Sequence, residues 1–183
     1  AAIADEVRNQ NPDALMMVDA VTSAFAADIK VDKIGADAIL FGTQKALSLP
    51  PGLAIGLISD RIIERSAGIP NTGYYTNFRK LKDNADVNYA LTTPPVSLLY
   101  GLDYQLDRVL SEGMPARYRR HDRMASMTEK WADDNLNGLF PEAGSRSKTI
   151  GVINRGTLDF DTFHKALKEK GYEISNGYGE VKS

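Results

Sequence analysis

Residues 38–59 read AILFGTQKALSLPPGLAIGLIS, two apolar runs joined by a polar segment that contains a single lysine, Lys45. The turn-forming residues Pro50, Pro51 and Gly52 separate this lysine from the second run. The second run follows the first too closely for a crossover helix, so we expect two antiparallel strands. Lys45 would then lie just after the end of the first strand.

Another apolar run, ALMMVDAV at residues 14–21, precedes this pair and contains an acid, Asp19, close to its end. A short run without alternation is typical of a strand buried on both faces of a parallel sheet. Helical patterns surround the three runs, at residues 1–10, 60–68, 94–113 and 115–137. The sequence therefore predicts an α/β fold with a mixed sheet.

The last part of the chain has a second set of patterns. Residues 148–155 and 172–175 have the composition of strands, and the amphipathic residues 158–171 predict a helix between them. We expect residues 1–113 to belong to one large domain and residues 114–183 to a smaller α/β domain that is incomplete. The chain opens inside a helical pattern and closes in a polar stretch, so we expect a fragment of a longer protein.

Composition and charge exclude several classes of function. A chain with 43% hydrophobic and 25% charged residues has the composition of an ordinary globular protein. Its formal net charge of -2 gives no reason to expect a nucleic acid or an anionic membrane as partner, and its apolar runs are too short to span a bilayer. The chain has no cysteine, which fits a reducing compartment, and we expect a cytoplasmic protein. No histidines have metal-ligand spacing, so we predict no metal site.

Asp19 and Lys45 are the first candidates for chemistry. Groups that bind ligands in open α/β sheets gather at the carboxyl ends of strands, where both residues are expected. Asp19 either caps the following turn or, desolvated by the apolar run, pairs with a cationic ligand. Lys45 is either a solvated residue at a strand end or a partly buried amine that attacks carbonyl groups.

The third candidate is the segment YALT at residues 89–92, directly before the helix expected to open at Pro94. Hydroxyl groups gathered at a helix N-terminus can bind a phosphate, although Thr92 could also be an ordinary N-cap. The three candidates together fit a ligand with a basic ring nitrogen, an aldehyde and a phosphate. Pyridoxal 5'-phosphate has all three groups.

Three motifs resemble those of class V aminotransferases: DAVTS at 19–23, GTQKALSLPPGLA at 42–54 and YALTTPPVSLLYGL at 89–102. They are most similar to the serine–glyoxylate and alanine–glyoxylate branch. The resemblance implies a fold type I pyridoxal-phosphate enzyme, represented here by part of its large mixed-sheet domain and part of its small C-terminal domain. It also implies a homodimer with shared active sites, in which Tyr89 and Thr92 reach the cofactor phosphate of the neighbouring subunit.

The resemblance implies further roles for single residues. Lys45 would be the catalytic lysine that forms an imine bond with the cofactor aldehyde, and Asp19 would pair with the protonated ring nitrogen. Val21 would pack on the cofactor ring, and Gln44 would form a hydrogen bond near the phosphate.

The implied reaction is a transamination between a small amino acid of the serine or alanine type and a 2-oxo acid such as glyoxylate or pyruvate. The family's Gly-containing phosphate turn, its ring-stacking aromatic residue and its carboxylate-binding arginine have no match here, so we expect the fragment itself to be inactive. A phosphoserine aminotransferase, a cysteine-desulfurase-like lyase of the same fold and a non-catalytic remnant domain remain alternatives. The basic run RYRRHDR at residues 117–123 is interpreted as a solvated helix face.

Overall fold

A computed structural model describes residues 2–177 of the chain. The chain divides into two compact units, unit 1 (Ala1–Tyr118) and unit 2 (Arg119–Ser183). The expected domain boundary after residue 113 stays a prediction.

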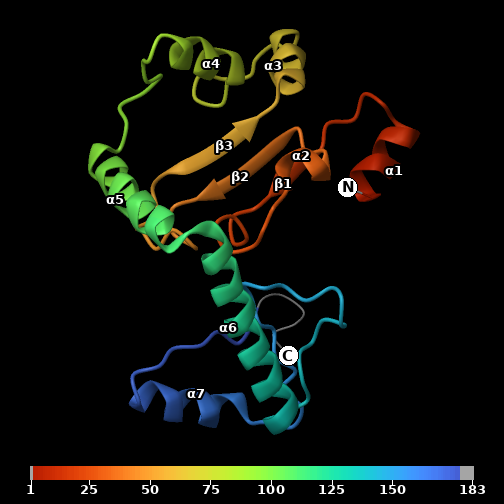
Figure 1. Cartoon of the computed structure of the whole chain (residues 1–183), viewed down its shortest axis with the longest axis vertical. Coiled ribbons are helices and arrows are strands. Elements are labelled where there is room, and N and C mark those ends of the chain that lie inside the picture. Colours follow the sequence, from red (N-terminus) through yellow and green to blue (C-terminus); the bar gives the residue numbers. More distant parts are fainter. Residues whose placement is uncertain (1, 178–183) are drawn as a thin grey trace. The chain divides into compact units, whose positions relative to one another are not determined.

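The sheet of unit 1 has three strands, β1 (Met17–Asp19), β2 (Ala38–Gly42) and β3 (Ala54–Ile58), in that order across the sheet (Figure 1). β1 is parallel to β2, with Asp19 opposite Leu40, and β2 is antiparallel to β3. The predicted antiparallel pair and the predicted parallel neighbour are therefore confirmed. β1 is shorter than the apolar run that predicted it.

The helices of unit 1 follow the predicted patterns with two additions, α2 (Val31–Ile34) and α4 (Phe78–Asp86). α4 lies in a stretch for which the sequence predicts no element, because its residues FRKLKDNAD are mostly polar and none of them is buried. Among the described residues, no helix is both long and apolar enough to cross a lipid bilayer. The helices are α1 (Ala2–Gln10), α2 (Val31–Ile34), α3 (Asp60–Ala67), α4 (Phe78–Asp86), α5 (Val96–Glu112) and the first turn of α6 (Met114–Asn135).

β2 begins directly after a buried charge, Asp37, which is only 4% exposed. Its carboxylate accepts the N–H of Met16 at 2.8 Å and lies 3.2 Å from Arg8 Nη2 and 3.0 Å from Arg61 Nη1. Burial alone would raise the pKa of Asp37, but the Met16 N–H and the two guanidinium groups together hold it below its ordinary value of 3.8. This cluster ties α1 and α3 to the amino-terminal edge of β2.

Unit 2 contains the rest of α6 together with α7 (Phe160–Glu169). Asp159 caps α7, because its carboxylate accepts the N–H of Asp161 at 3.1 Å. The predicted helix at residues 158–171 is confirmed.

The two strands predicted for unit 2, at residues 148–155 and 172–175, are wrong. The first contributes a single isolated bridge, between Ile153 and Leu139, and the second is not a strand. A pair of short segments forms a stable ladder only when further strands or a packed helix cover its apolar side chains. Here Tyr172 is 64% exposed, so burial does not stabilise an extended pair.

Candidate active site

The carboxyl ends of β1 and β2 meet at one edge of the sheet, because the two strands are parallel. Asp19 is the last residue of β1, and the N–H of Ala20 continues the ladder by donating to Leu40 O at 2.8 Å. Gln44 and Lys45 follow directly after the end of β2. The topology therefore brings Asp19, Val21, Gln44 and Lys45 to the same edge, whereas their roles stay predictions.

Asp19 is exposed at this edge. Its Oδ1 accepts the N–H of Val21 at 2.9 Å, so this oxygen caps the turn that follows β1. Within residues 2–177, Oδ2 has no hydrogen bond or ion pair. The expected desolvation by the apolar run is absent, and one oxygen remains available to a cation.

A turn anchored by two buried side chains carries Lys45. Thr43 is fully buried, and its Oγ1 donates to Pro50 O at 2.9 Å, while Leu47 is 1% exposed. Gln44 and Lys45 lie between these anchors and point outward, so both are exposed. Of the two alternatives for Lys45, the described residues match the solvated side chain at a strand end and not the partly buried amine.

The Lys45 side chain has no hydrogen bond or ion pair among residues 2–177, and in particular it does not pair with Asp19. Opposite charges at one edge normally gain from pairing only when their geometry brings them together. A ligand that contacts both Asp19 and Lys45 would interact with both charges. This arrangement fits pyridoxal phosphate, which offers an aldehyde to an amine and a basic ring nitrogen to a carboxylate.

Gln44 owes its position to Gly42, the last residue of β2. A Cβ atom at Gly42 would collide with the carboxamide oxygen of Gln44, which folds back over the glycine. Gly42 therefore makes room for a polar side chain at the carboxyl edge. Sequence reasoning overlooked both Gly42 and Thr43, although a glycine at a strand end is a known sign of close approach.

Arg117 corrects the interpretation of residues 117–123 as a solvated face, because it is only 6% exposed. Its guanidinium group donates to the carbonyl oxygens of Phe25 and Ala46 and pairs with Glu112. Phe25 lies in the loop after β1, and Ala46 lies in the turn after β2. Sequence reasoning missed this contact, since no local pattern distinguishes Arg117 from the arginines that follow it.

Tyr89 and Thr92 lie elsewhere, in the exposed connection between α4 and α5. The N-cap of α5 is Pro95, which makes no side-chain capping hydrogen bond, so the alternative of Thr92 as an ordinary N-cap does not hold. The hydroxyl of Tyr74 donates to Leu91 O at 3.2 Å and holds this connection locally. Among the described residues, no hydrogen bond joins Tyr89 or Thr92 to the edge that carries Lys45.

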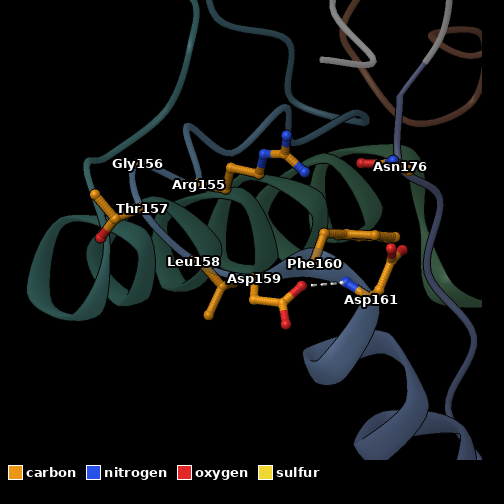
Figure 2. Close-up of a pocket in the computed structure, with 8 residues that line it drawn as sticks. All are labelled: Arg155, Gly156, Thr157, Leu158, Asp159, Phe160, Asp161 and Asn176. Carbon is orange, nitrogen blue, oxygen red and sulfur yellow. Dashed lines mark hydrogen bonds between the residues drawn. The ribbon is translucent and has the colours of Figure 1, made fainter.

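A separate pocket of about 420 Å³ lies in unit 2, at the start of α7 (Figure 2). It is lined by residues 155–161 and by Asn176, and includes none of the predicted site residues. Figure 2 shows the carboxylates of Asp159 and Asp161 beside the helix start, with Arg155 as the cationic side chain. Two carboxylates at the capped helix start disfavour a phosphate there.

Comparison with known proteins identifies the family. Residues 1–180 match the family model described as Aminotransferase class-V. The chain belongs to the class V aminotransferase family. The cofactor of this family is pyridoxal 5'-phosphate, and this class V chain has the α/β architecture of the fold type I enzymes.

Individual relatives cover nearly all of this class V chain. It is 37% identical over 173 residues to L-aspartate–glyoxylate aminotransferase of Paracoccus denitrificans, covering 92% of the chain and 43% of the relative. It is 35% identical over 170 residues to a protein named soluble hydrogenase, small subunit, of Synechococcus, covering 91% of the chain and 43% of the relative. The crystal structure of alanine–glyoxylate aminotransferase from Nostoc superposes with a TM-score of 0.86 at 25% identity, covering 98% of the chain and 48% of that structure. The chain thus spans less than half the length of these relatives.

Proposed function

We propose that this class V chain belongs to a pyridoxal-phosphate-dependent transaminase. It would move an amino group between a small amino acid of the serine or alanine type and a 2-oxo acid such as glyoxylate or pyruvate. The observation that carries the proposal is the carboxyl edge of β1 and β2, where an exposed amine and an exposed carboxylate lie without pairing to each other. The glyoxylate aminotransferases among the similar proteins support the choice of acceptor.

Lys45 and Asp19 have the central roles in this proposal. Pyridoxal phosphate, when bound, supplies a protonated ring that withdraws electrons from the Cα atom of the substrate. Lys45 would hold the cofactor through its aldehyde group, and its Nζ would carry a proton to and from the substrate Cα atom. The Asp19 carboxylate keeps the ring nitrogen protonated, because a nearby negative charge favours the charged form.

The remaining site residues hold the cofactor. Val21 packs on the ring, and the Gln44 carboxamide donates a hydrogen bond near the phosphate. Tyr89 and Thr92 are proposed to reach the cofactor phosphate of a neighbouring subunit in a homodimer. Both residues are exposed in the α4–α5 connection, and neither forms a hydrogen bond with the Lys45 turn among the described residues, which supports this assignment. The absence of cysteine from the chain supports a cytoplasmic location.

The test of cofactor binding uses the protein at its full encoded length. Pyridoxal phosphate is added, the absorbance of the bound cofactor is recorded, and borohydride reduction is followed by peptide mapping. We expect one reduced pyridoxyl adduct, on Lys45. No adduct, or an adduct on another lysine, would contradict the proposal and favour a non-catalytic domain.

The test of substrate class is a panel of amino donors with glyoxylate or pyruvate as acceptor. Serine, alanine, aspartate and phosphoserine are compared by kcat/KM. We expect serine or alanine with glyoxylate to give the highest value. A preference for phosphoserine would contradict the substrate assignment while leaving the cofactor site intact.

A further inference from the structure

Arg117 connects the two loops that carry the candidate site, and the three partners of its guanidinium group lie within unit 1. Its Nε donates to Phe25 O at 2.8 Å, its Nη1 lies 2.9 Å from Glu112 Oε2, and its Nη2 donates to Ala46 O. The guanidinium group is planar and presents its donors in a fixed fork, so it fixes the directions of these bonds as well as their lengths.

One of these carbonyl groups lies directly next to the candidate catalytic lysine. Ala46 follows Lys45 in the chain, and Ser48 N donates to Lys45 O at 2.9 Å within the same turn. A contact to Ala46 O therefore restrains the peptide plane next to Lys45. The other carbonyl, of Phe25, belongs to the loop that follows Asp19 and contains Val21.

Both loops contain a residue with a left-handed backbone. Phe25 has a φ of 65° and Ser48 a φ of 56°, values that residues with a side chain rarely adopt. Such conformations persist only where the surrounding contacts enforce them, and they gather at functional sites. For Phe25, those contacts are the hydrogen bond from Arg117 and the edge-to-face packing of its ring on Phe41 of β2, at 5.7 Å.

We propose that Arg117 is a positioning residue that fixes the turn containing Lys45 relative to the loop that follows Asp19 and contains Val21. This role rests on the proposed function, because it concerns the placement of Lys45 toward the cofactor. Arg117 itself is buried and is not a catalytic residue. Glu112 neutralises its charge, which makes burial of the guanidinium group tolerable.

If Arg117 contributed only to folding, replacing it would affect cofactor trapping on Lys45 no more than replacing Arg61 does. Arg61 therefore provides a control. Arg61 also binds a carboxylate and carbonyl oxygens, those of Asp37, Pro12 and Ala14. It does so at the amino-terminal edge of β2, away from Lys45. The same change, arginine to lysine, can therefore be made at each edge.

The experiment compares Arg117→Lys, Arg117→Gln and Arg61→Lys in the protein at its full encoded length. An ammonium group keeps the charge opposite Glu112 but cannot reach both carbonyl oxygens with the geometry of the fork. Without cofactor, amide hydrogen exchange is measured for residues 20–27 and 43–49, where loop hydrogen bonds such as Ala24 N to Ala20 O and Leu49 N to Thr43 O protect the amides. With pyridoxal phosphate, the concentration that gives half-maximal borohydride trapping on Lys45 is measured.

In Arg117→Lys we expect exchange to become about tenfold faster in both segments and the half-maximal concentration to rise about tenfold, as expected for the loss of one or two net hydrogen bonds. In Arg61→Lys we expect both values to stay within about twofold, since Arg61 contacts neither loop. If Arg117→Gln does not fold, Arg117→Lys still decides the question.

Two results would overturn the proposal. One is exchange that stays slow in either segment of Arg117→Lys, which would show that the guanidinium group does not couple the loops. The other is faster exchange in both segments with unchanged trapping on Lys45, which would show a structural contact without a role in placing the lysine. If the protein with intact Arg117 traps no cofactor on Lys45, the proposed function is contradicted, and the positioning role with it. The exchange data would still show separately whether Arg117 couples the two loops.

Discussion

The two edges of the sheet in unit 1 hold charge in opposite ways. At the amino-terminal edge Asp37 is 4% exposed and lies between two arginines, with a backbone N–H as a third partner. At the carboxyl edge Asp19 and Lys45 are exposed, and neither forms an ion pair among the residues that the structure describes. A buried carboxylate stays ionised only with hydrogen-bond or ion-pair partners, whereas water solvates an exposed carboxylate and leaves it accessible to a ligand.

The comparison separates charges that stabilise the fold from charges that are available to a substrate or cofactor. Removing Asp37 should affect unfolding and leave cofactor binding unchanged, and removing Lys45 should do the reverse. The four predictions below test this separation, starting with the largest expected effect.

Substitution Lys45→Ala should abolish the borohydride-trapped adduct and lower transaminase kcat at least about a hundredfold, because a positioned acid–base group contributes about that much or more. Its unfolding free energy should stay within about 0.5 kcal/mol of the unmodified protein, since Lys45 is exposed. The control is Lys33→Ala, which replaces an exposed lysine in α2 and should keep both adduct and activity. An adduct of normal yield in Lys45→Ala would place the cofactor elsewhere.

Substitution Asp37→Ala should lower the unfolding free energy by about 2–3 kcal/mol, measured in urea. The substitution leaves Arg8 and Arg61 without their shared carboxylate. Because these side chains are 32% and 43% exposed, water solvates them in part, and the loss of stability is smaller than for a fully buried ion pair. The matched change Asp19→Ala, at the other edge, should cost less than about 0.5 kcal/mol. Equal losses at the two edges would refute the separation.

The stability of the protein should depend on pH through Asp37. Its pKa is lower in the folded state than its ordinary value of 3.8, so its contribution is complete above the unfolded pKa and is lost as pH falls through the folded pKa. Between about pH 5 and pH 3, the unmodified protein should therefore lose more unfolding free energy than Asp37→Asn. Asp159 also has a lowered pKa, owing to its hydrogen bonds with Thr162, but it is present in both proteins and cancels. Parallel pH profiles would argue against a stabilising role of the Asp37 carboxylate.

Substitution Gly42→Ala should have the smallest effect. The new methyl group displaces the flexible carboxamide of Gln44 rather than the backbone, so stability should change by less than about 0.5 kcal/mol. If Gln44 forms one hydrogen bond with the cofactor, displacing its carboxamide should raise the Kd for pyridoxal phosphate about two- to tenfold, measured by absorbance titration. Gly56→Ala, in β3, is the control glycine substitution and should leave the affinity unchanged. An unaltered affinity in Gly42→Ala would exclude the assigned role of Gln44.

The sequence predicted the strands of unit 1 well, because each apolar run there has its partner within the same unit. The runs at residues 14–21 and 38–59 supply β1, β2 and β3 with the expected directions. The run at residues 148–155 has equally good composition, but among the described residues it pairs only with the short segment 137–140, through one isolated bridge and a few backbone hydrogen bonds. Strand formation depends on neighbours that composition does not reveal.

For the candidate site, the sequence predicted where the residues lie but not how they are held. The position of Lys45 after β2 followed from the pattern, whereas its exposure depends on what packs around the turn. The burial of Arg117 was beyond local patterns, since its two carbonyl partners lie 92 and 71 residues away in the chain. Contacts over such separations arise only once the fold brings the loops together.

The measurement that tests the central claim most directly is a crystal structure of the protein at its full encoded length, grown with pyridoxal phosphate. We predict continuous density between Lys45 Nζ and the cofactor, with Asp19 at the ring nitrogen and Asp37 still bound to its two arginines. Cofactor density away from the carboxyl edge of β1 and β2, or joined to another lysine, would contradict the account.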